Sequence, residues 1–227
     1  MTFPVPRPRR APESTAGAPG HCPARAQRLP GPGHRDPHNW DPARLRAWYV
    51  DGLGWGELYT AGPVARLRTG IRFDVLEMPA EAGLALLREL GPECVAALGG
   101  GTVRLLVSAG GAQELPGLLD WLQWGALVPE LRALGTGGHI DAPLPPGPPG
   151  VPVLPVPGAG AGSQGAAVWL RPPELGGEVE TALPGPVAVG DGRGAPSLSL
   201  VRLVDAAASY CLRVRMRRVA AQPLAFS

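Results

Sequence analysis

The clearest pattern of apolar and polar positions lies in the stretch that reads IRFDVLEMPAEAG. Phe73, Val75 and Leu76 are apolar residues, mainly of strand-forming type, and they surround the carboxylates Asp74 and Glu77. This pattern predicts a short strand. Side chains two apart on a strand share a face, whereas side chains three apart point to opposite faces.

The strand is followed at once by a helical pattern. Pro79 cannot extend a central strand, but it suits the first turn of a helix. Over 80–90 the composition favours a helix, with Leu84, Leu87 and Leu90 on one face. Two carboxylates therefore lie near the end of a strand, where open α/β sheets tend to build their sites.

The rest of the chain predicts further elements by the same reasoning. We expect helices over 42–50 and 115–123, a hairpin of 93–98 and 102–107, strands over 127–134 and 166–170, and a long helix over 197–219 that Ser197 caps. The glycine-rich stretch 52–56 lacks the Lys-Ser/Thr and the preceding strand of a phosphate loop. We interpret it as a turn that packs Trp55 into the core.

These elements predict an α/β (α+β) domain over 40–173, built on a mixed sheet with flanking helices. With 33 glycines and 29 prolines, the chain also carries stretches that cannot bury a core. We expect 1–39 to be a disordered tail and 174–195 a linker before the C-terminal helix and tail of 196–227. We expect 1–39, 144–165 and 174–195 to be mobile.

Composition adds little to the picture of function. The net charge is +2, and all 21 basic residues are arginine, which we interpret as a bias of genome composition rather than as a nucleic-acid signal. Three widely spaced cysteines do not indicate a disulfide framework and favour a reducing cytosol. We find no apolar run near the roughly 18 residues of a membrane span and no secretory signal. We therefore expect a cytoplasmic protein without a membrane partner.

Five strings occur in one order along the chain: RFDVLEMPAEAG, VRLLVSAG, LPGLLDWLQWG, LRALGTGGHIDAPLPP and VWLRPP. In this order and spacing the chain resembles the small proteins of GC-rich actinobacteria that are similar to the N-terminal domain of bifunctional DNA primase/polymerases. These belong to the archaeo-eukaryotic primase superfamily. The resemblance covers roughly residues 40–173 and implies a primase-polymerase-like fold.

The resemblance also implies a site. Working members use an acidic pair on a strand, a histidine on a neighbouring strand and a third acidic residue, with two divalent ions, Mg²⁺ or Mn²⁺. It places the acidic pair at Asp74 and Glu77, as catalytic and metal-binding residues, and the third carboxylate at Asp141 or Glu130. Arg104 would then meet the triphosphate.

This sequence departs from the family pattern at three points. Asp74 and Glu77 are three residues apart rather than two, and Arg104 or Leu105 stands where the histidine is expected. The strand before the Gly-Gly element lacks its carboxylate, and Glu130 is the nearest acid. We therefore interpret the chain as a primase-like fold with a degenerate catalytic site.

Three functions follow. In the first, the domain binds nucleotide or nucleic acid, including DNA, through Arg104, Arg132 and His139, without catalysis. In the second, it is an active metal-dependent nucleotidyltransferase. In the third, the proline-rich segments 1–39 and 143–165 present polyproline to a protein partner.

Each residue also has a structural interpretation. In this interpretation we expect Asp74 to form an exposed ion pair with Arg72, and Glu77 to interact favourably with the dipole of the following helix. We then expect Asp141 to cap a turn and His139 to pack in a strand.

Overall fold

The computed structural model describes residues 42–61, 64–92, 94–146, 167–176, 179, 183–185 and 198–221. The chain divides into two units, Met1–Arg35 and Asp36–Ser227, and all described residues belong to the second. The predicted tail 1–39 and most of the predicted mobile segments 144–165 and 174–195 lie outside the described residues.

The helices are interspersed among groups of strands along the chain. The helices are α1 (Pro42–Arg46) with the π-helical turn η1 (Ala47–Gly52), α2 (Ala80–Glu89), α3 (Gly111–Trp121), the 3₁₀ turn η2 (Gly125–Leu127) and α5 (Leu200–Ala220). The strands are β1 (Leu58–Ala61), β2 (Val64–Arg68), β3 (Phe73–Pro79), β4 (Ala96–Gly99), β5 (Thr102–Ser108), β6 (Arg132–Leu134), β7 (His139–Asp141) and β8 (Val168–Arg171).

The larger sheet has five strands in the order β6-β3-β5-β4-β8, and all its neighbours are antiparallel. Because β3 and β4 both pair antiparallel with β5, they run parallel to each other, and α2 connects them. In the same way β5 and β6 flank β3 and are connected by α3. The order β3-α2-β4-β5-α3-β6 is the split βαβ, or ferredoxin-like, arrangement, which β8 extends at the β4 edge.

The smaller sheet has the order β1-β2-β7 and is also antiparallel. Beyond β7 the chain reaches β8, because Leu144 N donates to the carbonyl of Ala167 and Leu144 forms a bridge with Val168. β6 and β8 are the two edge strands of the five-stranded sheet. Ile140 of β7 packs with Val75 and Leu106 in one core, so β7 lies over that face of the sheet.

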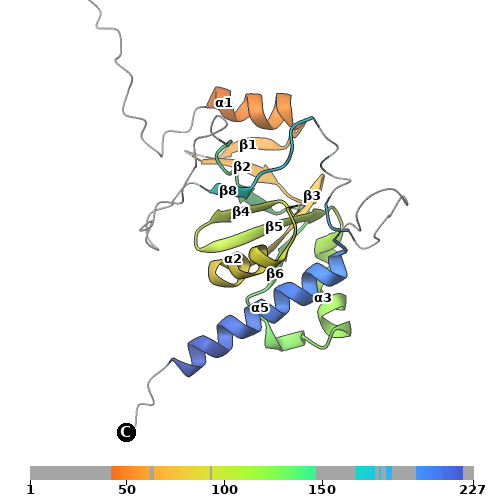
Figure 1. The fold of residues 1–227 in the computed structure, drawn as a ribbon. Coiled ribbons are helices and arrows are strands. Elements are labelled where there is room, and N and C mark those ends of the chain that lie inside the picture. Colours follow the sequence, from red (N-terminus) through yellow and green to blue (C-terminus); the bar gives the residue numbers. More distant parts are fainter. Residues whose placement is uncertain are drawn as a thin grey trace, which may run out of the picture. The chain divides into compact units, whose positions relative to one another are not determined.

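The five-stranded sheet has a core on each face. On one, the helical face, β3 and β5 contribute Leu76, Met78, Val103, Leu105 and Val107, which pack against α2, α3 and α5. We call the opposite face the second face. There, β3 and β5 contribute the buried residues Phe73, Val75 and Leu106, which pack against α1, η1 and the three-stranded sheet. Figure 1 shows α2, α3 and α5 together on one side of the strands and α1, β1 and β2 on the other.

The contact between α2 and β5 is close. Pro79, expected in the first turn of the helix, is instead the last residue of β3, opposite Thr102; with φ −53° and ψ 140° it is the N-cap residue that precedes Ala80. One turn later, a Cβ on Gly83 would lie 2.4 Å from the Cβ of Val103. Only a residue without a side chain allows this approach of α2 to the sheet.

The structure confirms the α+β class and most predicted elements. The helices near 42–50 and 80–90 and the hairpin of β4 and β5 are present, and Trp55 is buried in the core, 1% exposed. The helix predicted at 115–123 begins four residues earlier, at Gly111.

Several features differ from expectation. The strand predicted over 127–134 is limited to β6, Arg132–Leu134, because Leu127 ends a 3₁₀ turn. The mixed sheet is instead two antiparallel sheets, and β1 and β2 were not predicted. The side chain that caps α5 is that of Ser199, and the expected cap, Ser197, lies outside the described residues. In the predicted linker, Val179 and Leu183 are buried against the core of the second face.

Candidate functional site

Asp74 belongs to the helical face of the five-stranded sheet. It is fully buried, and its Oδ2 accepts hydrogen bonds from the backbone N–H groups of Gly110 and Ala112, each at 2.9 Å. These two groups stand at the start of α3, whose N-cap residue is Gly110, which has no side chain to accept them. Asp74 therefore does for α3 what a capping side chain does, and its charge favours the positive end of the helix dipole.

The exposed ion pair of Asp74 with Arg72 is not present. Arg72 instead donates to Glu57 at 3.3 Å, and Asp74 is closed off from solvent. The sequence interpretation failed here because Arg72 lies in a bend before β3, whereas the Asp74 side chain is buried in the strand and directed to the start of α3.

Glu77 lies on the second face, opposite to Asp74. Its Oε1 accepts a hydrogen bond from Nε of Arg104 at 2.8 Å. The register of β3 and β5 sets these two residues directly across from each other, which is why the pair forms. Their side chains are only 19% and 16% exposed, so the pair is partly withdrawn from water.

Arg132 extends this row. On the other side of Glu77, β6 places Arg132 directly across from it, and Arg132 is exposed. On the β4 side, a Cβ on Gly99 would lie 2.9 Å from Nη1 of Arg104. Glycine at this position therefore lets the Arg104 side chain lie across β4. The second face thus carries one carboxylate between two arginines.

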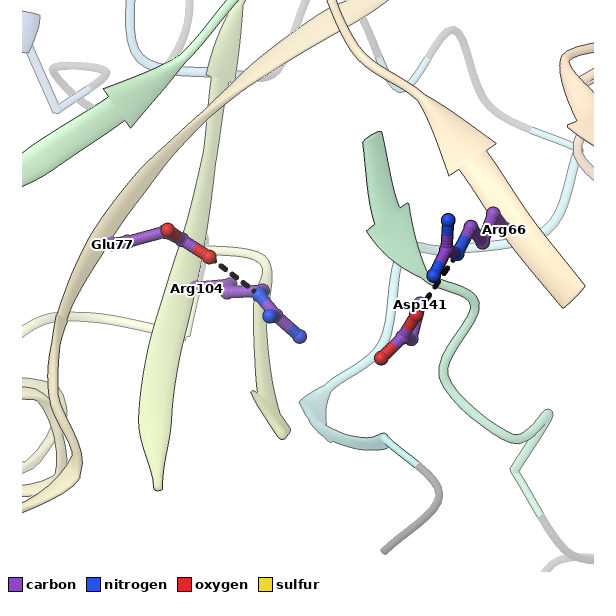
Figure 2. A network of polar contacts seen from close by, with 4 residues as sticks. All are labelled: Arg66, Glu77, Arg104 and Asp141. Atoms are coloured by element: carbon purple, nitrogen blue, oxygen red, sulfur yellow. Dashed lines mark hydrogen bonds and ion pairs between the residues drawn. The ribbon is translucent and has the colours of Figure 1, made fainter. Parts of the chain in front are cut away.

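The smaller sheet brings a second pair to the same region. Arg66 of β2 stands across from Asp141 of β7, and Nε of Arg66 lies 3.4 Å from Oδ1 of Asp141. Figure 2 shows both pairs in one view, with Asp141 on the side of its pair that is turned toward Arg104. Asp141 thus pairs across strands rather than capping a turn.

A buried tyrosine holds the chain just after β7. The hydroxyl of Tyr49 donates to the carbonyl of Pro143 at 2.6 Å. Burial raises the pKa of Tyr49 well above its usual value, and so the hydroxyl keeps its proton and remains a donor. This bond fixes the exit of β7, the strand that carries Asp141 and His139.

His139 is exposed on β7, and its neighbours were missed by the sequence analysis. The ring of Tyr59 lies 6.4 Å from that of His139 in an edge-on arrangement, and Cζ of Arg68 lies 5.1 Å above the Tyr59 ring. The signal that would have found Arg66 and Arg68 is the alternation of apolar and cationic residues in VARLR at 64–68.

The predicted metal ligands do not face a common ion in this arrangement. Asp74 and Glu77 point to opposite faces of β3, and Glu77 is already paired with Arg104. Glu130, the alternative third acid, is half-buried just before β6. Among the residues that the structure describes, no three histidine, cysteine or acidic side chains gather as a metal site would require.

Arginine guanidinium groups suit phosphate, because their planar forks donate paired hydrogen bonds to its oxygens. A carboxylate beside such an arginine fixes its orientation while lowering the net charge. With Arg66, Arg104 and Arg132 against two carboxylates, the region keeps a positive excess. The arrangement is suited to holding an anion.

Comparisons of the chain with protein-family models, with curated proteins and with solved structures find no match. In the part of the chain that the structure describes, none of the helices combines the length and apolar character needed to cross a membrane.

Proposed function

We propose that this protein is a primase-polymerase-like domain that binds nucleotide or nucleic acid on the second face of its five-stranded sheet and does not catalyse nucleotidyl transfer. The observation that carries the proposal is the row of Arg132, Glu77 and Arg104 across three strands, with the pair of Arg66 and Asp141 in the same close view (Figure 2). Phosphates of the ligand would meet the arginines, and the carboxylates hold two of the arginines in place.

The position of Asp74 supports the absence of catalysis. A two-metal mechanism needs carboxylates that converge on ions about 4 Å apart. Here Asp74 serves the start of α3, and on the second face Glu77 is engaged by an arginine. Neither carboxylate is held as a metal ligand is.

The binding proposal is tested by fluorescence anisotropy with a labelled nucleoside triphosphate and a labelled single-stranded oligonucleotide. Arg104→Ala and Arg132→Ala are each expected to weaken binding about tenfold at low salt, because each removes a charge-assisted contact to phosphate. Arg88→Ala, an exposed arginine on α2, is the matched control.

Affinity for the oligonucleotide must also fall steeply with salt, since binding releases counterions from the phosphates. Binding that is insensitive to salt, or equal losses in the Arg88 and Arg104 variants, would overturn the proposal. Primer extension with Mn²⁺ tests the enzyme alternative, for which the signature is a product that disappears in Glu77→Ala.

A further inference from the structure

The face of the three-stranded sheet that is turned away from the core carries a group of aromatic and cationic side chains. The strand register places Tyr59, Arg66 and Asp141 in one cross-strand row, and Arg68 and His139 in the next. The alternate positions of these strands belong to the core, so the group shares one face.

The contacts inside this group are specific. The Arg68 guanidinium lies over the Tyr59 ring, with Cζ 5.1 Å from the ring centroid, and the His139 ring meets Tyr59 edge-on at an interplanar angle of 78°. Arg68 and His139 are exposed, and Tyr59 is half-buried. Among the described residues no carboxylate forms an ion pair with Arg68, in contrast to Arg66.

We propose that Tyr59, Arg68 and His139, the Tyr59 platform, stack against a base of single-stranded nucleic acid. The Arg68 guanidinium already lies over the Tyr59 ring. Arginine guanidinium planes and aromatic rings both stack on unpaired bases, and the N–H groups of the guanidinium reach phosphate oxygens. Tyr59 fixes Arg68 before the ligand arrives, which reduces the entropy lost on binding.

The charge and the neighbours of the platform favour this occupant. Arg66 stands beside Arg68 on β2, and its partner Asp141 is turned toward Arg104. A single strand offers phosphates and flat bases in alternation, which matches cations alternating with an aromatic ring. An acidic peptide offers the charge without the flat ring. The inference rests on the proposed function and adds that the ligand is a strand rather than a lone nucleotide.

The test is anisotropy with a labelled oligothymidylate, an abasic strand of equal length and a glutamate-rich peptide as competitor. Tyr59→Ala is expected to weaken oligothymidylate binding about tenfold, while Tyr59→Phe stays within about twofold of wild type, because stacking needs the ring and not the hydroxyl. Thr60→Ala, exposed on the same strand, is the matched control. Abasic binding is expected to be weaker and unchanged by Tyr59→Ala.

A 2-aminopurine base in the strand supplies a readout that a structural defect would not imitate. Its fluorescence should be quenched on binding to wild type and not to Tyr59→Ala at saturating protein. Wild-type affinity in Tyr59→Ala, with Arg104→Ala impaired, would overturn the platform and leave the proposed function standing. If neither variant changes affinity, both proposals fail. If the peptide displaces the strand and itself requires Tyr59, the platform serves an acidic protein segment and the inference is wrong.

Discussion

Asp74 and Glu77 are three residues apart on β3, yet their surroundings differ completely. Asp74 is enclosed beneath α3, where two backbone N–H groups bind its carboxylate. Glu77 pairs with Arg104 on the opposite face, which is partly open to solvent. The comparison shows that acidic residues close together in sequence need not form one site, because the period of a strand separates them. Stability is expected to depend on the first carboxylate and binding on the second.

The largest expected effect is on stability and comes from Asp74→Ala. It leaves two N–H groups at the start of α3 without their acceptor and empties a buried position, so we expect a loss of about 2–4 kcal/mol in the free energy of unfolding. Urea denaturation measures it, with the exposed Asp120→Ala of α3 as control. Unchanged or increased stability would instead place Asp74 among functional residues.

Gly83→Ala tests how closely the helical face is packed. The new Cβ would meet Val103, so we expect destabilisation of about 1–3 kcal/mol, despite the better helix propensity of alanine. Gly117→Ala on α3 is the matched control, because nothing lies within 4 Å of its Cβ position. That variant should gain about 0.5–1 kcal/mol. A gain in both variants would show that α2 is not pressed against β5.

Cys211 of α5 reports whether the helical face is closed to water. Burial, with a smaller effect of the Glu130 carboxylate, raises the pKa of its thiol from 9.0 to about 12. Because the pKa of this thiol is higher in the folded protein than in the unfolded one, the protonated thiol contributes stability. That contribution is fully present below pH 9 and is lost as the pH rises toward about 12. At pH 10 we expect wild type to have lost about 1 kcal/mol more than Cys211→Ala, relative to pH 7. Parallel pH profiles of the two proteins would contradict this.

The smallest effect is expected from Glu77→Gln on the second face. Removing the carboxylate frees positive charge, so anion affinity should increase about twofold to fivefold at low salt and less at high salt. The control is Glu81→Gln, whose carboxylate faces Arg217 and Arg218 of α5. A metal-dependent enzyme would behave in the opposite way, since loss of a ligand carboxylate would abolish its Mn²⁺-dependent product.

Local pattern was informative where neighbours in sequence decide the structure. The strand-forming apolar residues around Asp74 indicated β3, Pro79 indicated the start of α2 to within one residue, and three glycines indicated the turn between β4 and β5. β1 and β2 were missed because each is short, four and five residues. Their apolar residues alternate with polar or cationic ones and so give no continuous apolar run.

The sequence by itself determined that Asp74 and Glu77 lie on opposite faces, because side chains alternate along any regular strand. Only the tertiary structure decided what each carboxylate does. The partners of Asp74 are at Gly110 and Ala112, 36 and 38 residues away, and the partner of Glu77 is 27 residues away. These hydrogen-bond partners depend on strand order and register. Both arise from the packing of the whole sheet, so no local sequence pattern predicts them.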